Sequence, residues 1–250
     1  MDFTLYTYEK ILSGLIHCNY EFQTFSEFLS SPKKKSVILR HDVDLLPKNA
    51  LEFARIQAKY KIKAVYYFRS IPESWDDDII KEIHELGHEI GYHYECLTTH
   101  KGDFPRAITQ FESDLIKLRK IAPVDTICMH GSPMSKYDSK ELWNEYKYQD
   151  FGIIGEPYFD VNFNEVLYLT DTGRTWKNKK ISVRDRVSTS YDFQFSSSKE
   201  IIAALNKDDL PLQLLFNFHP QRWTNNPFYW FKELIFQNIK NQIKRLIVKY

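Results

Sequence analysis

Two aspartates, Asp42 and Asp44, follow an apolar run in the first third of the chain and are separated by one residue. In an extended segment, residues at i and i+2 point to the same side, so these two carboxylates would face one site. Neighbouring carboxylates repel each other unless a cation or a shared proton lies between them. The pair therefore indicates a metal site or an acid–base site. The alternative is that one of the two caps the helix expected at 48–60.

Three histidines also lie at the ends of apolar segments, as the two aspartates do. His93, His130 and His219 each end a short apolar segment that is typical of a buried strand. If these strands are parallel, their carboxyl ends gather the side chains at one edge of the sheet, where α/β proteins bind ligands. One carboxylate and two imidazoles form a facial set of metal ligands with positions left open for water and substrate. A single histidine of this kind is more often structural, but the repetition at several strand ends favours a site.

His88 differs from the other histidines because it begins its expected strand, five residues before His93. It therefore belongs at the opposite end of a barrel, away from the edge where barrel chemistry takes place. We expect His88 to have a structural role.

The elements that must position these residues alternate along the chain. Strands are expected from 37 to the aspartate pair and at 64–68, 88–93, 125–130, 151–154, 166–170 and 212–218. Helices are expected within 3–30 and at 48–60, 76–86, 105–121, 138–147, 198–205 and 228–249. Such alternation predicts a parallel sheet, open or closed into a barrel. The segment 171–197 has no clear assignment and is expected to be a loop or hairpin over the site. Because no repeat or linker is visible, we expect a single domain over 1–250.

The composition limits the class of protein. The chain has 250 residues, of which 43% are hydrophobic and 27% charged, as in an ordinary globular protein. A net charge of +1 argues against bulk electrostatic binding to nucleic acid. The cysteines are odd in number and have no CxxC spacing, which is typical of a reducing compartment. No signal peptide and no bilayer-spanning run is visible, so we expect a cytoplasmic protein.

Four segments resemble motifs of the polysaccharide deacetylases of the NodB-homology kind, carbohydrate esterase family 4. Arg40–Asp44 resembles the first motif, usually Thr-Phe-Asp-Asp-Gly, with one residue inserted between the carboxylates. Gly87–His93 resembles the stretch that leads to the metal-binding histidine and is the most specific match. His130–Pro133 stands in place of the Arg-x-Pro-Tyr motif, and Leu215–Pro220 resembles the final motif. The resemblance covers about 36–220 and is strongest to the divergent branch found among surface-polysaccharide biosynthesis proteins.

This resemblance implies a fold and a division of roles. The fold would be a distorted or incomplete (β/α) barrel with seven or eight parallel strands. Asp44 and His93 would bind a divalent metal ion, Asp42 would act as general base, and His219 would protonate the departing amine. The metal, with a backbone N–H of the 131–133 turn, would stabilise the oxyanion. Zinc is the expected ion, and cobalt and nickel are used by relatives.

The chain departs from the family pattern at the remaining ligand. Leu97 stands where the family has a second histidine, and His130 replaces an arginine that would orient the catalytic base. His100 and Glu95 are alternative third ligands. We prefer His130, because the sheet positions a strand-end residue whereas His100 is expected in a loop.

Groups that suit a sugar substrate occur near the inferred site. Glu95 shares the strand side of His93, and the loop after 166–170 carries Arg174 and Trp176. Arg222 and Trp223 follow His219 directly and are better placed for sugar stacking and anion binding. The helix at 228–249 has an apolar stripe with basic residues beside it. It either covers the barrel, the commoner arrangement, or makes peripheral contact with an anionic membrane.

The resulting hypothesis is a metal-dependent hydrolase that removes an N-acyl group, acetyl or formyl, from an amino sugar. The resemblance places this step in surface-polysaccharide biosynthesis, such as O-antigen or capsule assembly, with the sugar linked to a nucleotide, lipid or glycan. The alternative is a catalytically silent barrel that binds glycans or partner enzymes, because two motifs are altered. The sugar, its carrier and the oligomeric state do not follow from the sequence.

Overall fold

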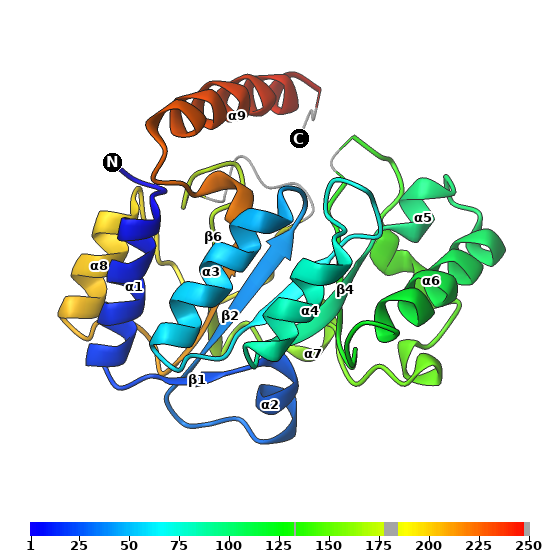
Figure 1. Ribbon diagram of the computed structural model, residues 1–250, viewed down its shortest axis with the longest axis horizontal. Helices are drawn as coiled ribbons and strands as arrows, with labels where there is room; N and C mark the ends of the chain where they lie inside the picture. The colour runs from blue at the N-terminus through cyan, green and yellow to red at the C-terminus, as the bar shows by residue number, and fades with distance from the viewer. Residues whose placement is uncertain (133, 178–184, 248–250) are drawn as a thin grey trace.

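The computed structural model describes residues 1–132, 134–177 and 185–247, and Figure 1 shows how their helices and strands are arranged. Strands within these residues form one seven-stranded sheet in which every pairing is parallel. The strands are β1 Glu21–Gln23, β2 Ser36–Val43, β3 Val65–Phe68, β4 Glu89–Tyr94, β5 Ile127–Met129, β6 Val166–Thr170 and β7 Gln213–Phe218.

The strand order is β5-β4-β3-β2-β7-β6, with β1 paired to the first half of β2. β5 and β6 stand at the two ends of this order, and no ladder within the described residues joins them. The barrel is therefore incomplete on the side between β5 and β6. The expected distorted (β/α) barrel of parallel strands is confirmed.

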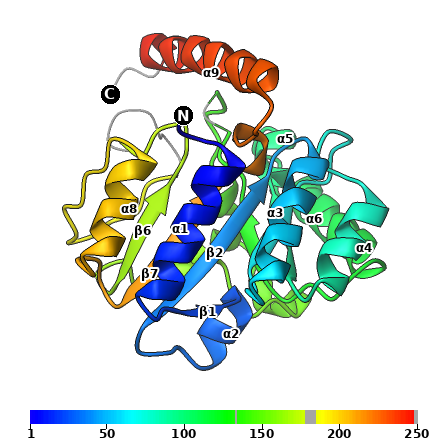
Figure 2. The same cartoon turned by 60° about the vertical axis from the view of Figure 1, so that its left-hand side comes forward.

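Helices cover the outer face of this sheet, as Figures 1 and 2 show for α1, α3, α4, α6 and α8. The α-helices are α1 Leu5–His17, α2 Phe25–Ser30, α3 Pro47–Lys59, α4 Asp77–Glu85, α5 Cys96–Thr99, α6 Phe104–Arg119, α7 Pro157–Asp160, α8 Ser198–Asn206 and α9 Pro227–Ile247. The short 3-10 helices are η1 Ser139–Asn144, η2 Tyr148–Phe151 and η4 Pro220–Arg222. In both views α9 lies apart from the other helices, at one end of the molecule.

The alternation of side chains along β2 explains how polar residues reach the barrel interior. Val37 and Leu39 pack in the large apolar core between the sheet and its helices. Ile38 points the other way, into a smaller apolar cluster inside the barrel. Continuing by two residues at a time, Arg40 and Asp42 lie on the interior side, above that cluster. The strand therefore delivers charge to the interior only at its carboxyl end.

Three segments differ from the local predictions. The segment 151–154 is not a strand, because the carbonyls of Phe151 and Gly152 accept hydrogen bonds from Arg119 instead of joining a ladder. Gly155, the next residue, forms an isolated parallel bridge with Thr126. The helix expected at 138–147 is present as the 3-10 helix η1, and the short strand β1 lies within 3–30, where only helical structure was expected. Of the segment 171–197, residues 178–184 lie outside the described residues.

Candidate metal centre and active site

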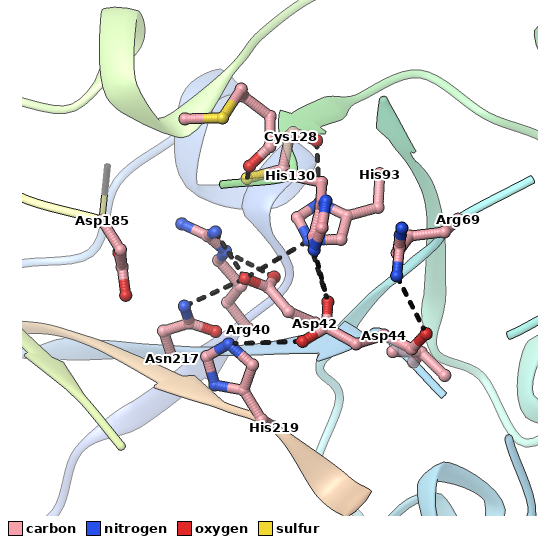
Figure 3. A network of polar contacts seen from close by, with 12 residues as sticks. Arg40, Asp42, Asp44, Arg69, His93, Cys128, His130, Asp185, Asn217 and His219 are labelled. Carbon is pink, nitrogen blue, oxygen red and sulfur yellow. Dashed lines mark hydrogen bonds and ion pairs between the residues drawn. The ribbon is translucent and has the colours of Figure 1, made fainter. Parts of the chain in front are cut away.

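The carboxyl ends of β2, β4, β5 and β7 bring the strand-end residues of the sequence together (Figure 3). Asp44, His93 and His130 each offer one ligand atom, and these atoms lie within 4.8 Å of one another. His219 approaches the same carboxylate, with 3.9 Å between its Nε2 and Asp44 Oδ2. The residues therefore form one cluster although they are far apart in the sequence.

The orientation of His93 is fixed by a hydrogen bond on the far side of its ring. Its Nδ1 lies 2.9 Å from the backbone oxygen of Cys128 on the neighbouring strand. Since a carbonyl only accepts, Nδ1 carries the proton and neutral His93 presents the lone pair of Nε2 to the cluster. This Nε2 lies 3.6 Å from Asp44 Oδ1.

His130 is held by a carboxylate in the same manner. Its Nδ1 lies 2.9 Å from Glu95 Oε2, and its Nε2 lies 3.5 Å from Asp44 Oδ1. Glu95 is itself fixed by Arg69, whose Nε and Nη2 donate to Oε1 at 2.9 and 2.5 Å. Burial raises the pKa of Glu95, but the hydrogen bond from His130 and the charge of Arg69 lower it by more than burial raises it. The net result is a pKa of about 2. Glu95 is thus placed to orient His130 and is absent from the donor sets found among the described residues. Its contact with substrate stays a prediction.

The donor set fits a divalent metal ion. Asp44 Oδ1 is buried and has no hydrogen-bond partner, although two imidazole nitrogens face it. Ligand atoms about 2.1 Å from a tetrahedral zinc lie about 3.4 Å apart. The separations of 3.6 and 3.5 Å from this oxygen to His93 and His130 are close to that value. A buried carboxylate oxygen without a partner, facing two available imidazole lone pairs, is the arrangement that a cation stabilises.

A second set of donors, Asp42, His93 and Cys128, also lies within 4.8 Å. It is less suited to a metal ion, because both oxygens of Asp42 already accept hydrogen bonds. The Cys128 side chain is fully buried, and burial raises the pKa of its thiol well above the ordinary value. Since metals bind the thiolate, the set centred on Asp44 is favoured.

Asp42 is held by a bidentate ion pair inside the barrel. Arg40 Nε donates to Oδ1 at 2.8 Å and Nη2 to Oδ2 at 2.7 Å, and Asn217 Nδ2 donates to Oδ2 at 3.0 Å. Burial raises the pKa of Asp42, but Arg40 and His93 lower it more, so the carboxylate is ionised. Arg40, which belongs to the first motif, therefore orients Asp42. The resemblance had assigned this role to an arginine of the third motif, where this chain has His130. The i, i+2 spacing of Arg40 and Asp42 could have revealed the role of Arg40 from the sequence.

His219 has a carboxylate partner that the sequence analysis missed. Its Nδ1 lies 2.6 Å from Asp171 Oδ1, and its backbone N–H donates to Asp171 Oδ2 at 3.1 Å. Asp171 follows β6 as His219 follows β7, so it carries the same strand-end signal. Burial raises the pKa of Asp171, but its contacts with His219 and Arg222 give a net lowering. The ionised carboxylate turns Nε2 of His219 toward Asp44.

The predicted sugar contacts of Trp176 and Trp223 are corrected by the structure. Both indoles lie in the core, with 4% and 0% of their surface exposed. Trp176 Nε1 donates to Ser198 Oγ at 2.9 Å, and Trp223 Nε1 donates to Asp171 Oδ2 at 2.6 Å. Buried rings cannot stack on a sugar, and Trp223 instead supports the carboxylate that holds the site histidine.

The two arginines predicted to bind substrate also have structural partners. Arg222 Nη1 donates to the backbone oxygen and to Oδ1 of Asp171, at 2.8 and 3.0 Å. Arg174 Nη1 donates to the backbone oxygen of Trp230 at 2.8 Å, and its guanidinium lies over that indole ring. Both side chains are about nine-tenths buried, so neither presents a free guanidinium to a substrate. We correct both assignments.

The remaining candidates lie outside the cluster. His100 ends α5 and is absent from both donor sets found in the described part of the chain. Leu97 is fully buried in the apolar core. His88 lies before β4 with its Nε2 3.1 Å from the backbone oxygen of Ala54, which agrees with a structural role. The backbone N–H predicted to contact the oxyanion belongs to Gly131 or Ser132, because Pro133 of the same turn has no N–H. Pro133 lies outside the described residues, so this prediction stays untested.

Fold and side chains together define an incomplete parallel (β/α) barrel with a candidate metal centre at the carboxyl ends of its strands. No family model matches the chain, and no curated protein matches it. Among solved structures, a CE4 esterase from Streptococcus mutans is similar, with 14% identity and a TM-score of 0.47 over 88% of this chain and 84% of that chain. A peptidoglycan deacetylase, PdaC from Bacillus subtilis, has 13% identity and a TM-score of 0.40 over 87% of this chain and 100% of that chain.

A CE4 family pseudoenzyme from Bacillus anthracis, BA3943, is also similar, with 13% identity and a TM-score of 0.45 over 85% of this chain. The match spans 62% of the length of that pseudoenzyme. Identities and TM-scores this low do not transfer a reaction to this chain. The chemistry has to follow from its own residues.

Proposed function

We propose that this protein is a metal-dependent hydrolase that removes an N-acyl group from an amino sugar. The observation that carries the proposal is the convergence of His93 Nε2 and His130 Nε2 on the unpartnered Asp44 Oδ1, at 3.6 and 3.5 Å. These three atoms would hold the ion. A divalent ion at this position supplies Lewis-acid polarisation of a carbonyl and lowers the pKa of a water molecule.

The flanking residues support hydrolysis of an amide. Asp42, kept ionised by Arg40, would accept a proton from the attacking water as its oxygen bonds to the acyl carbon. An amine is a poor leaving group until it is protonated. His219, with Nδ1 on Asp171 and Nε2 toward Asp44, would donate that proton as the C–N bond breaks. The products are a free amine and a carboxylic acid.

The finer assignment rests on the sequence motifs. Their resemblance to the branch of surface-polysaccharide enzymes supports an N-acetyl or N-formyl amino sugar as substrate, with zinc as the first choice of ion. The alternative of a silent glycan-binding barrel is less well supported, because candidate base, acid and three candidate ligands are all present and oriented. A binding protein would not need Asp171 to aim His219 or Glu95 to aim His130.

The test combines metal analysis with an assay for free amine. Protein purified without chelators is expected to contain about one divalent ion per chain and to release primary amine from N-acetylated or N-formylated sugars, free or linked to nucleotide, lipid or glycan. A chelator should abolish release, and zinc, cobalt or nickel should restore it. The Asp42→Asn variant is the control for contaminating hydrolases. Absence of both metal and turnover across the panel would favour the binding alternative.

A further inference from the structure

The C-terminal helix α9 is attached to the rest of the chain through its polar side. Gln237 and Asn241 are among its buried residues, and Asn241 Nδ2 donates to the backbone oxygen of Gly173 at 2.9 Å. At the start of the helix, Trp230 Nε1 donates to the backbone oxygen of Asp2 at 2.7 Å. The backbone oxygen of Trp230 accepts from Arg174. Polar contacts therefore hold α9 in place.

The apolar side of α9 faces away from the barrel. Phe228 is 71% exposed, Ile235 58% and Ile239 54%. Further large apolar side chains exposed on the same helix are Tyr229, Phe231, Phe236 and Ile243. At 100° per residue, Ile235, Phe228 and Ile239 form the centre of this face, roughly opposite Gln237 and Asn241. A helix that covered the barrel would show the reverse arrangement, so that expectation is wrong.

The charged residues of α9 indicate what kind of partner would bind its apolar face. Lys232 and Lys240 are exposed, and Lys232 lies between Ile239 and Ile243 on the helical wheel. Between Pro227 and Ile243 the sequence has a single acidic residue, Glu233, which is partly buried and lies near Arg174 and Arg222. The outward face in this part of the helix thus combines apolar and cationic side chains without a carboxylate.

Self-association of the chain through this face would be unfavourable. Pairing the face with itself would bury lysines against apolar side chains or other lysines, which is costly without a carboxylate partner. An anionic bilayer suits both features, because apolar side chains enter the acyl boundary while lysines extend to the headgroups. No helix in the described residues has the length and apolar content to span a bilayer, so α9 would lie in its plane.

We infer that α9 binds the surface of an anionic membrane through Phe228, Ile235, Ile239 and their apolar neighbours. The inference is independent of the proposed hydrolysis. Membrane binding would nevertheless affect the proposed hydrolysis, because the carboxyl end of β2 points toward the end of the molecule where α9 lies (Figures 1 and 2). Membrane binding would bring the candidate active site to the bilayer surface, where a lipid-linked sugar would be within reach.

Vesicle flotation tests this inference with the full chain. The protein is expected to float with vesicles of phosphatidylglycerol and phosphatidylcholine and to bind vesicles of pure phosphatidylcholine at least about tenfold more weakly. The variant Ile235→Glu/Ile239→Glu should bind anionic vesicles more than about tenfold more weakly, since each isoleucine contributes at least one decade of partitioning when buried. Lys232→Gln/Lys240→Gln should lower binding about tenfold and reduce its dependence on salt.

A matched control is available on another helix. Ile116 on α6 is 52% exposed and Ile239 is 54% exposed, so Ile116→Glu matches the single variant Ile239→Glu on a different surface and should leave binding unaltered. Because all substituted side chains are exposed, the variants should keep the circular dichroism spectrum of the parent. Failure of the parent to bind anionic vesicles would overturn the inference. So would equal loss in the Ile116 control, or a concentration-dependent dimer in ultracentrifugation that Ile239→Glu abolishes while vesicle binding stays unchanged.

Discussion

Arg40 and Asp42, two residues apart on β2, form a bidentate ion pair in the barrel interior, with donor–acceptor distances of 2.8 and 2.7 Å. Both side chains are almost fully buried. Removing either partner alone would leave an uncompensated charge away from water, which costs more than the pair itself contributes. Substitutions of Arg40 and Asp42 therefore test both the stability of the fold and the chemistry of the candidate site.

Arg40→Met is expected to lower the free energy of unfolding by about 3–5 kcal/mol, because the Asp42 carboxylate would remain buried without a counter-ion. Arg40→Met/Asp42→Leu should recover most of this loss, since it buries no charge. Urea unfolding of metal-free protein at pH 7 measures both values. A double variant no more stable than Arg40→Met would show that the ion pair is not the origin of the loss.

The roles of the two aspartates can be separated by substitution. Asp44→Ala should lose the bound metal, because it removes the unpartnered Oδ1 between the two imidazoles. Asp42→Asn should keep the metal and lower turnover by about 10²–10⁴-fold, the usual effect of losing a general base. Metal content and amine release are measured on the same preparations. Equal loss of metal in both variants would contradict this assignment.

His130 is expected to bind the metal whereas His100 is not. His130→Ala should weaken metal binding as severely as His93→Ala, and His100→Ala should have little effect. Glu95→Gln should weaken binding by about 10–100-fold, because it removes the carboxylate that orients His130. Competition with a chromophoric chelator gives the affinities. A severe effect of His100→Ala with a mild one of His130→Ala would mean that the loop residue is the ligand.

Asp171 is expected to matter for turnover but not for metal binding. Asp171→Asn should keep the metal, since Asp171 contacts His219, Arg222 and Trp223 and none of the proposed ligands. Turnover should fall by about 10²–10⁴-fold, because His219 would lose the group that holds it as a proton donor. Steady-state kinetics should show the change in kcat rather than in KM. A change confined to KM would instead indicate a role in substrate binding.

The pH dependence of stability provides a further check on Glu95. Its pKa is about 2 in the folded protein against an ordinary value of 4.5, so between these values the unfolded chain binds more protons. The contribution of Glu95 is therefore fully present above about pH 4.5 and is lost as the pH falls toward 2. Metal-free Glu95→Gln should show a smaller decrease in unfolding free energy from pH 5 to pH 3 than the parent, whereas exposed Glu85→Gln should match the parent. Identical slopes for all three proteins would exclude this coupling.

The sequence pattern by itself predicted a parallel sheet and the edge of that sheet at which the candidate site lies, whereas the barrel was expected from the motif resemblance. Apolar runs that end in Asp42, His93, His130 and His219 are readable because parallel strands always present their carboxyl ends at one edge. The alternation of period two also sets which side each residue takes, and it places Arg40 beside Asp42 on the same strand. Local pattern failed at 151–154, where Arg119 on another element satisfies the carbonyls.

Only the tertiary structure decided which partners orient these residues. His219 and Asp171 are 48 positions apart and His130 and Glu95 are 35 apart, so their pairing depends on how neighbouring strands are brought together. The apolar stripe of α9 shows the same limit. Periodicity reveals that a helix has two faces, but it does not say which face meets the protein. Here the polar side found hydrogen-bond partners on the loop after β6, which left the apolar side exposed.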